Sequence, residues 1–275
     1  MKNYDIVVGV GCSFMNGDAI CDKNGNALKS PHRSRPAIFL SEKLNCNEVN
    51  LAATGSSNDG MFRRIYNWVE ETSEVRAETT AETFNKNKKT LMIIGLSGTA
   101  RYPFWNRWRK QWYDLQPASI DAYDDTALTK VNKDITNGLG DVNELRNWQK
   151  YYIKWIYNQE QEDSKLQRNV MMLHYYLKAH NIDYYIFNSL EDSLGDIKDK
   201  INYISFEVPY NKKFNEDSWF NYLQYEMEVI DGNDSAHDEH LRSPKPPYGR
   251  HFCNGHPSPR AQEKLVERIY KELDK

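Results

Sequence analysis

The chain has 275 residues, of which 39% are hydrophobic and 27% are charged, so it can bury a full core in a single domain spanning residues 1–275. Its net charge of -3 gives no electrostatic reason to expect nucleic acid or an anionic membrane as a partner. The four cysteines, at positions 12, 21, 46 and 253, show neither CxxC pairing nor metal-finger spacing, which favours reduced thiols.

The N-terminal residues do not resemble a secretory signal. Met1 leads directly into an apolar run that carries Asp5 and has no small-residue cleavage site. No apolar stretch in the sequence reaches the length that a bilayer-spanning helix needs. We therefore expect a cytoplasmic protein, or one that passes from the cytosol into a particle.

The first third of the chain alternates between predicted strands and helices. A β-branched run predicts a strand over residues 6–10, buried on both faces, and residues 15–36 are polar and read as a long surface loop. Apolar spacing predicts a helix over residues 37–44, followed by a short strand over residues 48–52.

A further helix is expected after Asn58, because Met61, Ile65 and Trp68 form one apolar stripe, and residues 90–96 form a third strand. This alternation predicts an α/β fold in which a central parallel sheet has helices on both faces.

Residues 101–147 differ from what precedes them. This segment is rich in aromatic and polar residues and lacks sustained periodicity, so we interpret it as an irregular insertion or lid over the sheet edge. Within residues 101–112, the cations Arg107, Arg109 and Lys110 lie among Trp105, Trp108 and Trp112, as in single-strand or sugar binders. The alternatives are a partly exposed amphipathic helix whose tryptophans pack on the body, or an interface with another protein.

The last part of the chain returns to regular structure. Helices are predicted over residues 148–162 and 165–180, followed by a fourth strand over residues 183–187. Residues 192–248 are polar and irregular apart from residues 219–230, and residues 259–273 form an amphipathic closing helix.

Polar and small residues follow the predicted strands at one edge of the sheet. Ser13 follows the first strand, Gly55 follows the second and Ser97 follows the third. Because ligands of open parallel sheets bind beyond the carboxyl ends of the strands, this edge is the candidate site. His256, just before the closing helix, is the candidate base that activates Ser13 for acyl transfer. Taken singly, each glycine or serine here is more simply read as part of a turn.

The other six histidines are weaker candidates. His251 competes with His256, but its neighbours do not favour it, and His174 and His180 are expected to be partly exposed on a helix. His32, His237 and His240 lie in irregular segments. The last two flank two acidic residues, without a third ligand in a helical frame. No metal site is therefore predicted.

Four separated blocks of the sequence together resemble the GDSL-type, or SGNH, hydrolase family, in the order and strand context of that family. The blocks are Gly11-Cys12-Ser13-Phe14 with Asn16-Gly17-Asp18, Asn50-Leu51-Ala52 with Gly55-Ser56-Ser57-Asn58, Ile94-Gly95-Leu96-Ser97, and Asn254-Gly255-His256-Pro257-Ser258. They span nearly the whole chain and are most similar to divergent members from bacteriophage and environmental sequences. A phage-encoded chain would be expected in the virion.

The resemblance implies a three-layer α/β/α flavodoxin-like fold and ester hydrolysis without a metal or organic cofactor. By position, Ser13 would be the nucleophile and His256 the general base. The backbone N–H groups of Ser13 and Gly55 would belong to the oxyanion hole. Ser97 stands where the family has an asparagine that completes this hole, and Asn58 and Arg101 are candidate supporting residues.

The family's acidic residue, two or three positions before the histidine, is absent. Here these positions hold Asn254 and Cys253. An amide can orient an imidazole by accepting its N–H, but it does not stabilise imidazolium as a carboxylate does. Three alternatives follow: Asn254 or a backbone carbonyl orients His256 in a slow enzyme, a carboxylate such as Asp18 substitutes, or the scaffold binds without catalysis.

These alternatives define two hypotheses of different classes. The first is an esterase acting on an acylated sugar or similar small polar ester, since the aromatic insertion suits sugar stacking better than a long acyl chain. The second is a catalytically weakened or inactive binding or structural protein, for example a phage particle component. A nucleotide-binding reading is disfavoured, because residues 9–14 lack the third glycine of a dinucleotide loop and no helix is expected directly after them.

Overall fold

A four-stranded parallel sheet forms the centre of the protein. The computed structural model describes residues 3–17, 35–71, 83–106, 111–115, 147–148, 150–208, 216–226, 252–253 and 256–274. The strands are β1 (Ile6–Gly11), β2 (Asn47–Asn50), β3 (Thr90–Leu96) and β6 (Asp183–Asn188). Their order, β2-β1-β3-β6, follows the flavodoxin-like arrangement in which the first strand lies between the second and the third. All four strands were predicted, although the second was expected over residues 48–52 and is found at residues 47–50.

The two central strands are buried over their whole length. Every residue of β1 and of β3 is buried, as expected where helices cover both faces of a parallel sheet. In the register, Val8 pairs with Val49 on one side and with Met92 on the other. Gly11 pairs with Gly95 where these strands end, and this brings the loops that follow them side by side.

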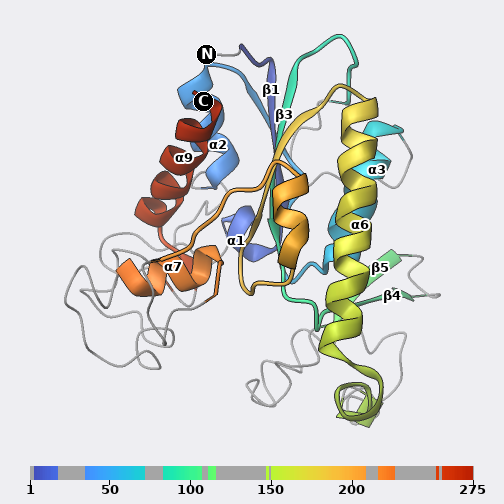
Figure 1. Ribbon diagram of the computed structural model, residues 1–275. Helices are drawn as coiled ribbons and strands as arrows, with labels where there is room; N and C mark the ends of the chain where they lie inside the picture. The colour runs from blue at the N-terminus through green and yellow to red at the C-terminus, as the bar shows by residue number, and fades with distance from the viewer. Residues whose placement is uncertain are drawn as a thin grey trace.

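Helices cover both faces of the sheet and complete three layers. Helices α2 (Pro36–Leu44) and α9 (Pro259–Leu273) lie against one face, and α3 (Asn58–Val69) and α6 (Gln159–Ala179) lie against the other (Figure 1). Helix α9 contributes Leu265, Val266 and Ile269 to the hydrophobic core. The predicted α/β class with a central parallel sheet is confirmed.

The boundaries of these helices follow from capping side chains. Ser258 accepts a hydrogen bond from the Ala261 N–H, which starts α9 at the predicted residue. Asn158 accepts from the Gln161 N–H, so α6 begins at Gln159 and the predicted start at residue 165 is wrong. A π-helical turn, η3 (Tyr152–Ile156), precedes it where a regular helix was expected.

The start of the predicted insertion is a β-hairpin. Strands β4 (Tyr102–Asn106) and β5 (Gln111–Leu115) pair antiparallel, with Trp105 opposite Trp112. Aromatic residues favour strands over helices, and cross-strand pairing of the two indoles stabilises the hairpin. The amphipathic-helix reading of this run is therefore wrong, and the irregular reading is wrong for these two strands. Residues 116–146 lie outside the described part of the chain.

Two further short elements correct the sequence analysis. Helix α1 (Ser13–Asn16) starts directly after β1, so the loop predicted from residue 15 begins later, and one of the two reasons given against a dinucleotide loop does not hold. The missing third glycine still argues against that reading. Within the segment predicted to be irregular, residues 195–200 form the 3-10 helix η4 (Gly195–Lys200).

The C-terminal region adds α7 (Trp219–Tyr225) and a small antiparallel ladder of β7 (Phe252–Cys253) and β8 (His256–Pro257).

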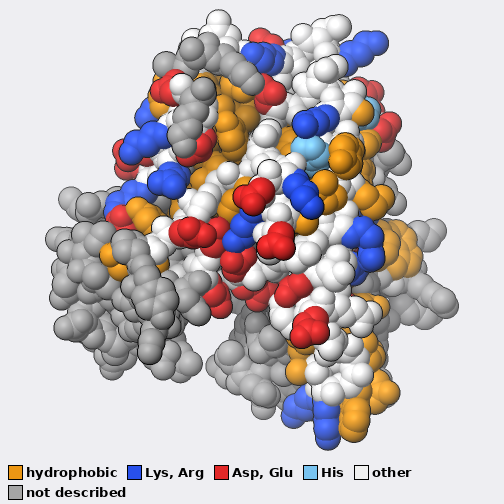
Figure 2. Space-filling view, viewed as in Figure 1, with side chains coloured by type: hydrophobic (Ala, Val, Ile, Leu, Met, Phe, Trp, Pro, Cys, Tyr) orange, Lys and Arg blue, Asp and Glu red, His pale blue; other side chains and the backbone are white. Residues whose placement is uncertain are grey.

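Figure 2 shows acidic side chains gathered at the centre of one face of the molecule. Among the described helices, none combines the length and apolar character required to cross a membrane.

Candidate active site

Ser13 lies at the carboxyl edge of the sheet, at the first residue of α1. Its side chain is 7% exposed, and the helical turn is fixed by hydrogen bonds from the Met15 and Asn16 N–H groups to the Cys12 carbonyl. The Ala53 N–H donates to the Gly11 carbonyl at 3.0 Å, which holds the loop after β2 against the end of β1. The loops after these two strands are therefore held together beside Ser13.

Side chains from distant parts of the sequence fix α1. The Asn50 amide donates to the Asn16 side chain at 2.8 Å, and Gln262 of α9 donates to the Phe14 carbonyl at 2.9 Å. Because α9 directly follows His256 in sequence, the second bond ties the end of the chain to the turn that carries Ser13.

His256 lies in β8, which contacts α1. Its ring meets Phe14, the residue next to Ser13, in an edge-on arrangement with 5.6 Å between the ring centroids. Phe14 also packs against Trp219 and Phe220 of α7. The serine and the histidine, from opposite ends of the sequence, are thus brought to the same edge of the sheet.

Gly55 lies in the turn after β2. Its φ of 71° is in the left-handed region that favours glycine, and the Ser56 N–H closes the turn by donating to the Ala53 carbonyl at 3.2 Å. The conformation of this turn is by itself a sufficient reason for a glycine at position 55.

Asn58 joins the loop after β2 to the loop after β3. Its amide donates to the Ser97 carbonyl at 2.9 Å and its side-chain oxygen accepts from the Ser97 N–H at 2.8 Å. The Ser97 hydroxyl is buried and has no hydrogen-bond partner within the described part of the chain. A hydroxyl left in this way can donate to a bound negative oxygen.

Arg101 follows the third loop and points back to the second, where its guanidinium donates to the Ser56 carbonyl at 3.0 Å. Together with Asn58, Thr99 and Lys165, it lines a small polar pocket beside the end of β3. Asn58 and Arg101, the two proposed supporting residues that the structure describes, therefore both line this pocket.

The described residues do not show which group orients the His256 imidazole. Asp18 and Asn254 lie outside them, and Cys253 pairs through its backbone with His256 in the β7–β8 ladder. The sequence prediction for this role stays a prediction.

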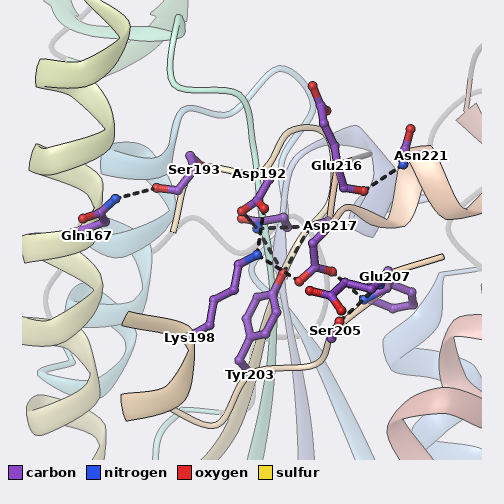
Figure 3. Close-up of polar contacts among 12 residues, drawn as sticks. Gln167, Asp192, Ser193, Lys198, Tyr203, Ser205, Glu207, Glu216, Asp217 and Asn221 are labelled. Carbon is purple, nitrogen blue, oxygen red and sulfur yellow. Dashed lines mark hydrogen bonds and ion pairs between the residues drawn. The ribbon is translucent and has the colours of Figure 1, made fainter. Parts of the chain in front are cut away.

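A carboxylate cluster at the end of β6 has a structural function. Asp217 is buried and accepts hydrogen bonds from the Phe206 N–H at 2.6 Å and from Lys198 at 2.9 Å, one on each oxygen (Figure 3). Lys198 also pairs with Asp192 at 2.8 Å. Since both oxygens of Asp217 serve the backbone and Lys198, this carboxylate holds the segment after β6 in place.

The charges of this cluster stabilise one another. Burial alone would lower the pKa of Lys198, but hydrogen bonds to Asp192 and Asp217 raise it above its usual value. Burial, followed by the charge of Asp217, raises the pKa of Tyr203. The lysine therefore stays charged and the phenol stays neutral at ordinary pH.

Of the remaining histidines, the structure describes His174 and His180. His174 was expected to be partly exposed, but it is 5% exposed and hydrogen-bonds through Nδ1 to the Tyr184 hydroxyl. His180 is half-buried, and His32, His237, His240 and His251 lie outside the described residues. Where the chain is described, no group of three or more His, Cys, Asp or Glu residues is placed to hold a metal ion.

One polar contact at this edge was not predicted. Asp114 of β5 accepts a hydrogen bond from the Ser57 hydroxyl at 2.5 Å and lies 3.3 Å from the Ser56 hydroxyl. The partners are far apart in sequence, so local patterning carries no signal for this contact.

No protein-family model matches the sequence, and no curated protein matches it significantly. Among solved structures, a chain aligns over 100% of this protein and 70% of its own length, with 12% identity and a TM-score of 0.45. That chain was described in work on a carbohydrate esterase whose active site displays divergent catalytic and non-catalytic binding functions.

Proposed function

We propose that the protein is a serine-dependent ester hydrolase with Ser13 as nucleophile and His256 as general base. The observation that carries this proposal is the packing of the His256 ring on Phe14, next to Ser13, at the carboxyl edge of a parallel sheet. The sequence blocks that resemble SGNH hydrolases support the same assignment. We place the enzyme in the cytoplasm, or in the virion if a phage encodes it.

The proposed reaction proceeds in two steps through an acyl-enzyme. Ser13 Oγ attacks the ester carbonyl while His256 takes the hydroxyl proton and then gives it to the departing alcohol. Water, deprotonated by His256, then releases the acid and restores Ser13. The N–H groups of Ser13 and Gly55 and the Ser97 hydroxyl would stabilise the negative oxygen, and Asn254, or else Asp18, would orient the imidazole.

The proposed substrate is a small polar ester or an acylated carbohydrate. Trp105 and Trp112 form a cross-strand pair on the hairpin, with 5.6 Å between ring centroids, and each is 41% exposed. Indole faces of this kind stack against sugar rings, whereas a long acyl chain needs an enclosed apolar channel.

Covalent labelling tests the proposal. We expect a fluorophosphonate to label the wild-type protein and a short-chain p-nitrophenyl ester to be hydrolysed, and Ser13→Ala and His256→Ala to abolish both signals. A serine-to-alanine change at Ser41, in α2, is the matched control and should retain both. If the folded wild-type protein gives neither signal, the catalytic proposal is wrong.

The second candidate is a non-catalytic binding or structural protein of the same fold. It is favoured by Asn254 and Cys253, which stand where a carboxylate would be expected, because loss of that charge costs several powers of ten in turnover. Such a protein would bind a glycan, or a protein partner through the tryptophan-rich insertion, without being labelled. Binding of acylated sugars by a protein that resists the fluorophosphonate would favour this candidate.

A further inference from the structure

We infer that Asp114 is a positioning residue that fixes the loop after β2, and with it the Gly55 N–H group, for catalysis. The inference rests on the proposed function, because it assigns Asp114 a role through the oxyanion hole. Asp114 belongs to the hairpin and has no direct part in the proposed chemistry.

The carboxylate of Asp114 binds the two serines that follow Gly55. Oδ1 accepts from the Ser57 hydroxyl at 2.5 Å, and Oδ2 lies 3.3 Å from the Ser56 hydroxyl. The Ser57 hydroxyl in turn accepts from the Gly60 N–H at 3.0 Å and caps α3. Asp114 therefore orients the cap of the helix that begins immediately after the oxyanion loop.

Gly60 provides independent support for this close approach. A Cβ atom at residue 60 would lie 2.7 Å from Oδ2 of Asp114 and 3.1 Å from Oδ1. Any side chain at this position would displace the carboxylate. The glycine in the first turn of α3 is thus explained by the space that Asp114 occupies.

Two arginines complete the surroundings of Ser56. Arg64 donates to the Ser56 hydroxyl at 2.7 Å and to the Leu51 carbonyl at 2.7 Å, and Arg101 donates to the Ser56 carbonyl. A charged carboxylate accepts stronger hydrogen bonds from the serine hydroxyls than an amide of the same shape would. Residues 56–57 are therefore held from three directions, and Gly55 precedes them by one peptide.

The same strand carries part of the proposed substrate surface. Trp112 lies two residues before Asp114 on β5, and the guanidinium of Arg63 in α3 lies 4.2 Å from the centre of its ring. The hairpin is thus attached to α3 at two points. A ligand that orders the hairpin would also order the loop that carries Gly55, which links substrate binding to the oxyanion hole.

The test compares Asp114→Asn with wild type and with Asp199→Asn, which makes the same change on an exposed carboxylate. For Asp114→Asn we expect kcat for p-nitrophenyl acetate to fall about ten- to a hundredfold while KM changes less than about twofold, since a misplaced donor acts on the transition state. Fluorophosphonate labelling should slow by a similar factor. Gly60→Ala should change both rates in the same direction.

Amide hydrogen exchange of residues 53–57 provides a readout that needs no activity. We expect exchange there to accelerate about tenfold or more in Asp114→Asn and to stay unchanged in Asp199→Asn. Unchanged kcat and unchanged exchange in folded Asp114→Asn would overturn the inference. Failure of both Asp114→Asn and Gly60→Ala to fold would also overturn it, in favour of a purely structural role. If wild type resists labelling, the proposed function fails, while exchange still decides whether Asp114 holds the loop.

Discussion

At the scale of single residues, the site depends on side chains that join one loop to the next. Asn58 is the clearest case, because its amide bonds both to the N–H and to the carbonyl of Ser97. This two-point contact fixes the backbone of residue 97 and occupies its N–H and carbonyl groups. The group of Ser97 that can still bind a ligand is its hydroxyl. In the proposed enzyme, Ser97 could therefore present a donor to an oxyanion, at the position where the SGNH hydrolases that the sequence blocks resemble have an asparagine.

This arrangement predicts the effect of Ser97→Ala. Removal of one oxyanion donor lowers kcat by about a hundred- to a thousandfold in enzymes of this mechanism, and we expect a loss in this range for short-chain esters. The stability should change little, because the hydroxyl has no partner in the described structure that the change would leave unpaired. Steady-state kinetics and thermal unfolding of both proteins measure these effects. An unchanged kcat in Ser97→Ala would exclude this hydroxyl from the oxyanion hole.

At the scale of secondary-structure elements, the hairpin and α6 show how packing decides what patterning leaves open. From the sequence, the run around Trp105 was interpreted as irregular chain or as an amphipathic helix. Strand pairing places Trp105 beside Trp112, and Arg63 of α3 lies over the second ring, so three residues from three elements form one surface. The sequence pattern alone did not indicate that these two strands pair.

The hairpin predicts a change in substrate preference. If sugars stack on the tryptophans, Trp105→Ala should raise KM for an acetylated sugar about tenfold or more, since a stacked ring contributes on the order of 1–3 kcal/mol. The same variant should hydrolyse p-nitrophenyl acetate with nearly unchanged kinetics. Tyr175→Ala, which removes an exposed aromatic ring on α6, is the control. Equal effects on both esters would assign Trp105 to folding instead of sugar recognition.

Helix α6 predicts a pH dependence of stability. Burial, and to a smaller extent Lys178, lowers the pKa of His174 below its usual 6.5 in the folded state. The unfolded chain therefore binds a proton first as pH falls. The stability that the neutral ring contributes is complete above pH 6.5 and decreases below it, by up to about 1.4 kcal/mol per pH unit for one proton.

Urea unfolding between pH 8 and pH 5.5 measures this dependence. His174→Gln should lose the part of the slope below pH 6.5 that comes from residue 174. His180→Gln, on the same helix, should retain that part because His174 is still present. A slope in His174→Gln equal to that of wild type would show that other groups determine the acid sensitivity.

At the scale of the whole molecule, the fold could be predicted from sequence and most site contacts could not. The β-branched runs of β1 and β3 are so apolar that strands buried on both faces are the natural reading, and Ser258 with Pro259 marks the start of α9. These signals are local. Strand order then brings Ser13, Gly55 and Ser97 to one edge, which is why that edge was the predicted location of the site.

Other features depend on contacts between residues far apart in sequence. His174 looked like an exposed helical residue because its partner, Tyr184, belongs to β6. Helix α1 has only four residues, too few for any periodic pattern. The contact between Asp114 and Ser57 joins the hairpin to α3 and exists only once the tertiary structure has formed. Prediction therefore fails where a residue's environment is set by another element.

The two termini offer a practical advantage for the proposed experiments. Figure 1 shows both ends of the chain at the edge of the sheet where the strands begin, opposite the loops that carry Ser13 and Ser97. An affinity handle or a fluorescent reporter fused at either terminus would therefore extend away from those loops. Sensor-chip immobilisation through such a handle should leave the candidate site open to sugars flowed past it.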